Sequence, residues 1–457
     1  MGNSDNSLAI ILAAGEGTRM KSAIPKPLHQ VAGLSLLAHS IASAQTATSD
    51  IAVVVGAGGD MVSDAALVAA PSATIHEQTE RLGTAHAVLA AEGALTRAMG
   101  DAVILYADTP MISAKTLDQM RQSGANGADV VILGFHAANP GGYGRLIVEN
   151  GALTRIVEAK EASPKELTIT FCNSGVVWSD AQTLLSLLKD VGNNNAKGEY
   201  YLTDIVEIAN ARGLTCAAVE CDEAETLGVN SRADLAAAEA AFQHRARTSA
   251  MANGATLTAP ETIWFSHDTR LGRDVVVEPN VVFGPGATVH DGATIRAHSH
   301  LEGCIVGSGA IIGPYARLRP GADIGEYARI GNFVEVKNTT FGKGAKANHL
   351  AYVGDAMVGA GSNIGAGVIT ANYDGVFKYP SNLGENAFVG SNTTLIAPVD
   401  IGAGAYIAGG SVITGTVADG ALALSRTEKQ EKPGLGARLM AKLRQMKAAG
   451  QKKKGAI

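Results

Sequence analysis

A six-residue repeat of apolar side chains runs through the second half of this 457-residue chain. Six successive hexads open on an apolar residue from Leu271 to Leu301, and after a one-residue deletion six more follow from Val306 to Val336. Further hexads open at Phe341, Val358, Ile364, Leu383, Val389, Leu395, Ile401, Ile407 and Ile413. This period predicts short strands turned at regular corners, three to a coil, with the apolar side chains pointing inward. We therefore expect a parallel β-helix of hexapeptide repeats.

The composition agrees with such a prism. Glycine supplies 54 residues and aromatic residues only 5%, and small residues let a chain turn tightly at each corner. The interruption between Thr370 and Asn382 is too long for a corner, so we expect a projecting loop there.

The first half instead alternates strand-like and helix-like segments, which predicts an α/β fold around a parallel sheet. The expected strands are 8–14, 51–56, 102–107, 129–135 and 175–178, and the expected helices are 34–46, 60–69, 84–98, 115–123, 180–189 and 202–212. A linking helix is expected over 231–249, with Ser231 as its N-cap and Asp234 at the capping-box position. Helical spacing recurs over 435–448. The predicted domains are 1–230, a linker 231–250, the prism 251–426 and a basic end 427–457.

The net charge of −6 is unevenly distributed. From Arg426 onward, ten basic and two acidic side chains give +8, so the preceding residues carry −14. A basic end could bind nucleic acid or anionic lipid, or it could be a solvated terminus. We favour the solvated terminus and expect no nucleic-acid or membrane partner.

The remaining composition indicates a cytoplasmic protein. The four cysteines, Cys172, Cys216, Cys221 and Cys304, lack the spacing of a zinc site and are expected to be free thiols. No apolar run reaches the ~18–20 residues of a membrane helix, and the start MGNSDNSLAI lacks the features of a signal peptide.

The most specific motif of the first half follows the first expected strand, as Gly15-Glu16-Gly17-Thr18-Arg19 and then Pro25-Lys26. Glycines at that point let backbone N–H groups approach an anion, and two cations at set distances could neutralise a triphosphate. These residues resemble the signature of the sugar-1-phosphate nucleotidylyltransferases, whose fold is Rossmann-like. Leu82-Gly83-Thr84, Tyr106-Ala107-Asp108, Gly142-Tyr143-Gly144-Arg145 and Asn173-Ser174-Gly175 follow in that family's order.

This resemblance implies a role for each matching residue. Arg19 and Lys26 would be catalytic, and Asp108 and Asn230 would bind Mg²⁺. The residues expected to bind UTP or the UDP-sugar are Leu12, Ala13, Ala14, Gly15, Lys26, Gln78, Gly83, Thr84, Tyr106, Ala107, Asp108, Gly144, Glu158, Asn173 and Asn230.

One stretch of the prism is unusually polar. Arg319 and Lys337 are 18 residues apart, about one coil, so they should stack on one face and suit a phosphate. His349 could act as a general base, with Glu335 raising its basicity.

Together the two motif sets resemble the bifunctional bacterial enzymes that acetylate glucosamine-1-phosphate and then uridylylate the product. The resemblance covers about residues 8–426 and implies a left-handed β-helix, a homotrimer with acetyl-transfer sites between subunits, and acetyl-CoA and UTP as co-substrates. The residues it assigns to the sugar phosphate are Arg319, Lys337, Tyr352 and Asn363, and those it assigns to acetyl-CoA are Ala366, Asn372, Tyr373, Ser391, Gly409 and Arg426.

Two other interpretations stay open from the sequence. The prism could merely oligomerise a monofunctional nucleotidylyltransferase, although a scaffold would not require His349, Glu335 or the loop at Asn372. The chain could also be a non-catalytic regulatory subunit, although Arg19, Lys26, Asp108 and Asn230 are all in place.

Overall fold

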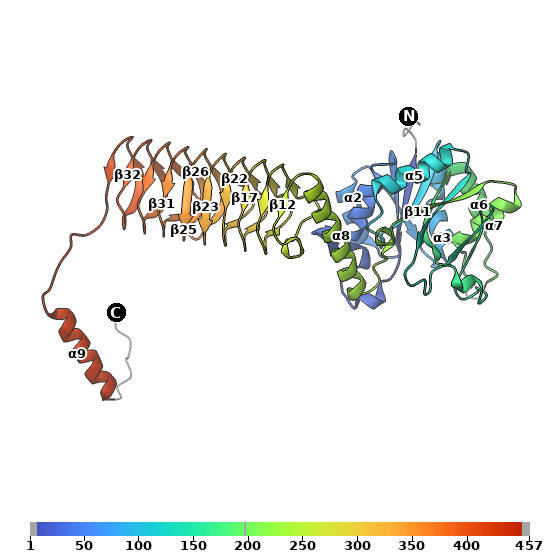
Figure 1. Ribbon diagram of the computed structural model, residues 1–457, viewed down its shortest axis with the longest axis horizontal. Helices are drawn as coiled ribbons and strands as arrows, with labels where there is room; N and C mark the ends of the chain where they lie inside the picture. Colours follow the sequence, from blue (N-terminus) through green and yellow to red (C-terminus); the bar gives the residue numbers. More distant parts are fainter. Residues whose placement is uncertain (1–6, 196–197, 450–457) are drawn as a thin grey trace. The chain divides into compact units, whose positions relative to one another are not determined.

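The computed structural model describes residues 7–195 and 198–449, and the chain divides into two compact units, Met1–Thr288 and Val289–Ile457. Figure 1 shows an α/β part and a stack of short-stranded coils. The start of the chain used to exclude a signal peptide lies in part outside the described residues, and the three lysines 452–454 of the predicted basic end lie wholly outside them.

The first unit is built on a sheet of strand order β11-β7-β10-β6-β1-β4-β5, with a β8–β9 hairpin beside β10. Its strands are β1 (Leu8–Ala13), β4 (Asp50–Gly56), β5 (Thr74–Gln78), β6 (Asp101–Tyr106), β7 (Val130–His136), β8 (Arg145–Glu149), β9 (Ala152–Val157), β10 (Phe171–Asp180) and β11 (Cys216–Cys221), with a small separate hairpin of β2 (Gln30–Val31) and β3 (Leu34–Ser35). The five strands expected from the sequence are all present, and β5, β8, β9 and β11 were not expected.

The sheet is mixed rather than wholly parallel. β1, β4, β5 and β6 run parallel, whereas β10 is antiparallel to both of its neighbours, β6 and β7. The chain reaches β10 from β7 through the β8–β9 hairpin, not through a crossover helix, and a strand that returns without a crossover pairs antiparallel.

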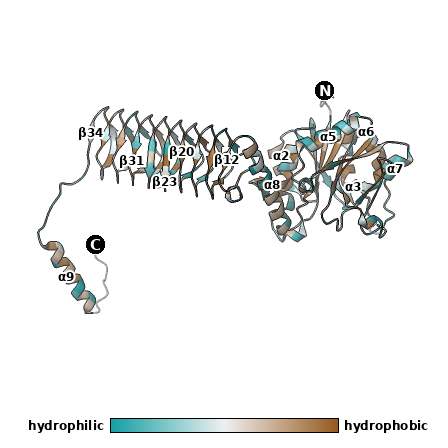
Figure 2. Ribbon diagram, viewed as in Figure 1, coloured by the Kyte–Doolittle hydropathy of each residue, from teal (hydrophilic) through white to brown (hydrophobic). Residues whose placement is uncertain are grey.

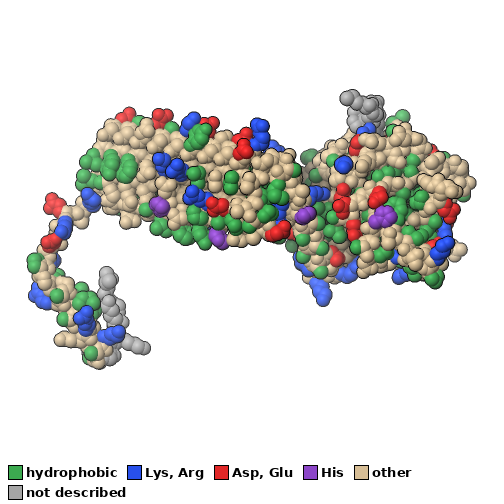
Figure 3. All heavy atoms as spheres, viewed as in Figure 1, with side chains coloured by type: hydrophobic (Ala, Val, Ile, Leu, Met, Phe, Trp, Pro, Cys, Tyr) green, Lys and Arg blue, Asp and Glu red, His purple; other side chains and the backbone are tan. Residues whose placement is uncertain are grey.

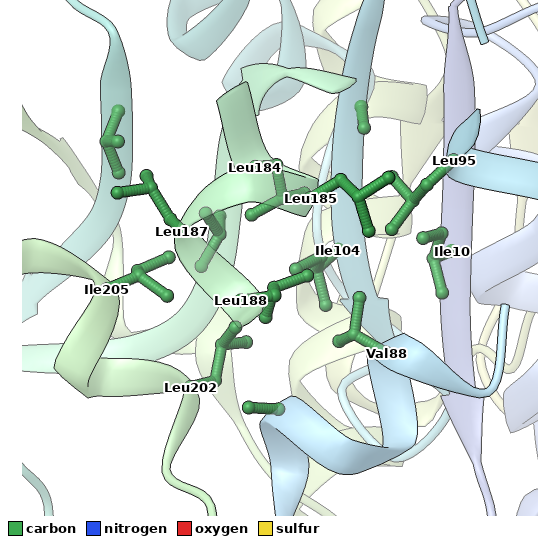
Figure 4. Close-up of a cluster of buried hydrophobic side chains, with 14 of the residues drawn as sticks. Ile10, Val88, Leu95, Ile104, Leu184, Leu185, Leu187, Leu188, Leu202 and Ile205 are labelled. Atoms are coloured by element: carbon green, nitrogen blue, oxygen red, sulfur yellow. The ribbon is translucent and has the colours of Figure 1, made fainter. Parts of the chain in front are cut away.

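Helices cover both faces of this sheet, as period-two burial along the central strands requires. Ile10 belongs to the core cluster beneath α3, α4, α6 and α7, and Ile11 belongs to the cluster beneath α1, α2 and α5. Figure 4 shows the first cluster, in which leucines of α6 meet Ile10 and Ile104. The helices are α1 (Leu36–Ala44), α2 (Asp60–Ala69), α3 (Thr84–Leu89), α4 (Glu92–Arg97), α5 (Ala114–Ala125), α6 (Ala181–Lys189) and α7 (Ile205–Ala211). The helix expected over 84–98 is therefore two helices, because the backbone leaves the helical conformation at Ala91.

The linking helix is α8 (Arg232–Ala252), three residues longer at its end than expected. The predicted capping box is confirmed, since Ser231 accepts from the Asp234 amide and the Asp234 carboxylate accepts in return. α8 packs within the first unit, where the buried Gln243 side chain bonds to the backbone N–H and carbonyl of Phe265. This contact explains why the first unit extends beyond α8 to Thr288.

The prism consists of parallel ladders of very short strands. In the first unit these are β12 (Thr256–Leu257), β13 (Arg270–Leu271), β14 (Val276–Val277) and β15 (Val282–Phe283), with β16 (Thr288–Val289) at the division. In the second unit, the first wall consists of β17 (Thr294–Ile295), β20 (Ile311–Ile312), β23 (Arg329–Asn332), β25 (Lys346–His349), β27 (Asn363–Ile364), β30 (Phe388–Val389), β32 (Tyr406–Ile407) and β34 (Leu422–Ala423). The other walls consist of β18 (His300–Leu301), β19 (Ile305–Val306), β21 (Arg317–Leu318), β22 (Ala322–Ile324), β24 (Glu335–Phe341), β26 (Tyr352–Val358), β28 (Ile369–Ala371), β29 (Ser381–Leu383), β31 (Thr394–Ile401) and β33 (Val412–Val417).

The hexad positions are buried as predicted. Every one from Val277 onward is under a tenth exposed, and only Leu271, in the first coil, is partly exposed. Figure 2 shows apolar residues recurring along the walls. The interruption predicted to project does leave the walls: residues 372–380 connect β28 to β29, and Tyr373, Val376 and Phe377 are exposed.

The predicted terminal helix is confirmed as α9 (Leu435–Ala448). Its surface carries both basic and apolar side chains, as Figure 3 shows, and Leu435, Leu439 and Met440 are about half exposed. Across the described part of the chain, no helix is long and apolar enough to cross a membrane. The four cysteines are free thiols, three of them buried.

Candidate active sites

The first candidate site lies where β1 and β6 end. Parallel neighbours bring their carboxyl ends together, so the chain after Leu12 and the chain after Tyr106 meet at one edge of the sheet. A cavity of about 300 Å³ opens there. Of the residues predicted to bind UTP or the UDP-sugar, those lining it are Leu12, Ala13, Ala14, Gly15, Lys26, Gln78, Gly83, Thr84, Tyr106, Ala107 and Asp108.

The glycine-rich segment forms a tight turn that leads into a 3₁₀ helix at Thr18–Met20. Gly17 has φ +63°, and a Cβ there would lie 2.5 Å from Cβ of Lys26, so only glycine lets the turn pack against Lys26. Arg19 and Asn230 join Gly15 and Lys26 around an adjoining cavity of about 410 Å³. The cations predicted to face a triphosphate are therefore on one side of the site.

Lys26 links the two predicted metal ligands. Its Nζ lies 2.5 Å from Oδ2 of Asp108 and 3.1 Å from Oδ1 of Asn230. The backbone also ties these segments together, because the Val229 amide donates to the Asp108 carbonyl at 2.8 Å. Two oxygens thus converge on one point that holds a positive charge, which is the donor set a Mg²⁺ ion with phosphate ligands requires. In the described part of the chain, no three His, Cys, Asp or Glu side chains group as a metal site.

The residues predicted to hold the sugar lie together beside this cavity. The Asn173 amide donates to the Gly144 carbonyl at 2.8 Å, and a Cβ on Gly144 would lie 3.6 Å from both the Asn173 side chain and Glu158 Oε1. Burial raises the pKa of Tyr106 well above its ordinary value, and the Asp108 and Glu158 carboxylates raise it further. Tyr106 therefore stays a neutral hydroxyl between the two groups.

In the prism, Arg319 and Lys337 stack on adjacent coils as predicted, since the Arg319 amide donates to the Val336 carbonyl at 2.8 Å. Each carries a carboxylate partner. Arg319 Nη1 lies 2.8 Å from Glu335 Oε1, and Lys337 Nζ lies 3.6 Å from Asp355 Oδ2. This pair of cations is held in place before any phosphate arrives.

His349 ends β25 and is exposed to solvent. Its Nδ1 lies 2.7 Å from Oδ1 of Asn332, its neighbour in register on β23. Nδ1 must be the protonated nitrogen for this bond to form, which leaves Nε2 free to accept a proton. The structure does not bring Glu335 to His349: Glu335 pairs with Arg319 and, at 3.8 Å, with Arg317. Asn332 therefore replaces Glu335 as the orienting partner.

The residues predicted to contact acetyl-CoA follow one edge of the prism. The Gly367 amide, next to Ala366, donates to the Leu350 carbonyl, next to His349, and the next coil places Asn392, beside Ser391, on Ala366. The series ends with Arg426, whose Nη1 donates to the Gly409 carbonyl at 3.0 Å. Four predicted contacts and His349 thus share one edge.

Three predicted residues lie apart from that edge or on other walls. Tyr352 pairs in register with Glu335, and Asn363 lies in β27 beside Lys346. Asn372 is buried at the base of the projecting loop, whereas Tyr373 is exposed and bonds to the Gly375 carbonyl.

Comparison with known proteins agrees with this two-part organisation. The MobA-like NTP transferase domain family matches residues 9–165, and the bacterial transferase hexapeptide family matches residues 268–303, 303–338 and 380–415. The chain is 53% identical to the bifunctional protein GlmU of Jannaschia sp. (strain CCS1), over 97% of this chain and 98% of that protein. It is 56% identical to the GlmU of Ruegeria sp. (strain TM1040), over 97% and 99% of the two chains. The chain belongs to the bifunctional GlmU family.

The GlmU of Agrobacterium fabrum is 50% identical over 98% of this chain, so family membership covers both units. With the hexapeptide match, the prism of this GlmU family member is a left-handed parallel β-helix.

Sequence reasoning missed several site residues in this GlmU family member. Arg81 lines both cavities of the first site and forms an ion pair with Glu16. Asn332 and Asp355 were missed because their partners, His349 and Lys337, are 17 or 18 residues away. The coil period could have found both, since each lies one coil from a residue already singled out.

Proposed function

We propose that this chain makes UDP-N-acetylglucosamine at two separate sites. The prism transfers an acetyl group from acetyl-CoA to glucosamine-1-phosphate, and the α/β unit then joins the acetylated sugar phosphate to UTP with release of pyrophosphate. The supporting observation is that one polypeptide holds both the Lys26–Asp108–Asn230 cluster at strand ends and His349 on a glycine-rich edge that ends at Arg426. Full-length relatedness to bifunctional proteins supports the same assignment.

At the first site, the sugar phosphate oxygen attacks the α-phosphorus of UTP. Lys26 and Arg19 neutralise charge that develops on the phosphate oxygens, an electrostatic contribution that requires no covalent intermediate. Asp108 and Asn230 would hold Mg²⁺, which supplies further neutralisation of the phosphates when bound. Gly144, Glu158 and Asn173 hold the sugar.

At the second site, the amine nitrogen of glucosamine-1-phosphate attacks the thioester carbonyl. Nε2 of His349 takes the amine proton as the C–N bond forms, and coenzyme A leaves as its thiol after the tetrahedral intermediate collapses. Asn332 fixes the imidazole so that Nε2 faces outward. Arg319 and Lys337 bind the sugar phosphate, with Tyr352 and Asn363 on the sugar.

The second site needs more than one copy of the chain. Lys337 is paired in register with Gly354, five residues beyond His349 along the same coil, so the two side chains start roughly 16 Å apart. That separation is too long for His349 and Lys337 of one chain to reach the amine and the phosphate of one small sugar. We infer that a neighbouring subunit completes the site, in a homotrimer working in the cytoplasm on small molecules.

A direct assay tests this function. Purified protein is incubated with acetyl-CoA and glucosamine-1-phosphate, with and without UTP and Mg²⁺, and products are separated by mass. Acetylated sugar phosphate without UTP, and UDP-N-acetylglucosamine only with UTP and metal, are the expected results. Uridylyl transfer alone would instead mean that the prism is a scaffold. Neither product would indicate a non-catalytic subunit. Light scattering of the same sample tests the trimer.

A further inference from the structure

Asp355 is the point where three polar side chains of the prism meet. Its Oδ1 accepts a hydrogen bond from Nδ2 of Asn338 at 2.7 Å, and its Oδ2 accepts one from Nδ2 of Asn372. The same Oδ2 lies 3.6 Å from Nζ of Lys337. Asn338, Asp355 and Asn372 are 17 residues apart, so they form a column along one corner of three successive coils.

The carboxylate of Asp355 is largely enclosed, with 13% of its side chain exposed, and it stays ionised. Burial raises the pKa of Asp355, but hydrogen bonds from Asn338 and Asn372 and the charge of Lys337 lower it further, so the net pKa lies below its ordinary value. A charge in this position has to be balanced by fixed donors, because an unpaired buried charge is costly. The geometry of Lys337 and Asn372 is therefore tied to the carboxylate.

Asn372 connects Asp355 to the projecting loop. The Asn372 carbonyl accepts from the Tyr379 amide at 2.9 Å, which closes the base of the loop, and the Asn372 side chain is buried against the prism. Inside the loop, Asp374 accepts from the amides of Val376 and Phe377, so the loop holds its own shape. The bond from Asn372 to Asp355 fixes that preformed loop to the coil below.

We propose that Asp355 is a positioning residue for acetyl transfer, holding Lys337 for the sugar phosphate and, through Asn372, holding the loop 372–380 at the coenzyme. This inference rests on the proposed function. Asp355 acts through its neighbours and takes no part in proton transfer. Because one oxygen serves both Lys337 and Asn372, loss of the charge affects sugar-phosphate and coenzyme binding together.

The test compares Asp355→Asn with a matched control. Asp400 also accepts from an asparagine one coil away, Asn382, at 2.8 Å, but it touches no predicted substrate residue. For Asp355→Asn, we expect kcat/KM for acetyl transfer to fall roughly 10- to 100-fold, the cost of a displaced substrate-positioning group. The KM values for both substrates should carry most of the loss. Asp400→Asn should stay within twofold of the wild type, and uridylyl transfer should be unchanged in both variants.

Two further measurements separate positioning from a general structural role. Lys337→Met and Asp355→Asn should be less than additive when combined, since each removes the same ion pair. Trypsin should cut after the exposed Lys378 faster in Asp355→Asn than in the wild type, while the melting temperature changes little.

Several results would overturn the proposal. These are acetyl transfer within twofold of the wild type, fully additive losses, or a loss confined to kcat with equal damage to uridylyl transfer. If the wild-type protein lacked acetyl transfer altogether, the proposed function would fail instead, so the two failures are distinguishable.

Discussion

Nζ of Lys26 lies 2.5 Å from Oδ2 of Asp108 although the two residues are 82 positions apart. Lys26 begins a short 3₁₀ helix (Lys26–Leu28) beside the glycine-rich turn, and Asp108 follows β6. Both side chains are mostly buried, with 10% and 25% exposed. The pair neutralises each charge until substrate arrives. Binding of a triphosphate would then draw Lys26 toward the phosphates and free Asp108 for a divalent cation.

Asp108→Ala should abolish uridylyl transfer and leave acetyl transfer near the wild-type rate. The substitution removes one of the two oxygens that converge at Lys26, and thioester aminolysis requires no metal. Both activities are measured on the same folded preparation, and EDTA added to the wild type should reproduce the pattern. Equal loss of both activities in a folded Asp108→Ala protein would contradict the two-site assignment.

Arg81 and Glu16 should have opposite effects on UTP binding. Their ion pair bridges the glycine-rich turn and the segment before Gly83, and both side chains are about half exposed. A triphosphate at this place competes with Glu16 for Arg81. We expect Arg81→Gln to raise the KM for UTP about fivefold to tenfold and Glu16→Gln to lower it, with kcat little changed. Matching increases for both variants would show that the pair only supports the turn.

Much of this architecture could be predicted because its signals are periodic and local. Hexad positions such as Ile312 and Ile330 face the interior since every corner repeats the same geometry. The capping box at Ser231 and Asp234 involves neighbours only. The direction of β10 was not predictable in this way, because strand direction depends on the connection before it, and the hairpin β8–β9 has only a weak alternating pattern.

The candidate sites divide along the same line. Residues tied to a compact motif, such as Lys26 and Asp108, were found and lie in contact. The partner of His349 was misassigned because Glu335 and Asn332 are both about one coil away, and only side-chain geometry shows that Glu335 belongs to Arg319. Arg81 carries no signal of its own, since a surface arginine is unremarkable until the fold places it at a cavity.

Asp204 predicts a pH dependence of stability in the first unit. Burial raises its pKa from 3.8 to about 6, with further contributions from Glu207, Glu161 and Glu158. A carboxyl with a raised pKa binds more protons when folded, so its contribution to stability falls as pH rises from about 4 to about 6 and stays low above that. Asp204→Asn should therefore be more stable at pH 7.5, by roughly 1 kcal/mol after allowance for solvent screening. The gain should vanish below pH 4 in urea unfolding, and a gain that persists there would exclude this cause.

His349→Ala should lower acetyl transfer by roughly 10²–10⁴, the range for a positioned general base, and leave uridylyl transfer unchanged. The amine of a sugar phosphate is mostly protonated near neutral pH, and only the free amine attacks a thioester. Nδ1 of His349 is fixed by Asn332, so Nε2 is the nitrogen available to take the proton. Raising the pH supplies free amine without help, so the deficit of the variant should shrink toward pH 9. Asn332→Ala should give a smaller loss with the same pH trend, because the imidazole remains but is no longer held. A deficit that stayed constant up to pH 9 would instead show that His349 positions the substrate, and full activity at pH 7 would assign proton removal to another group or to water.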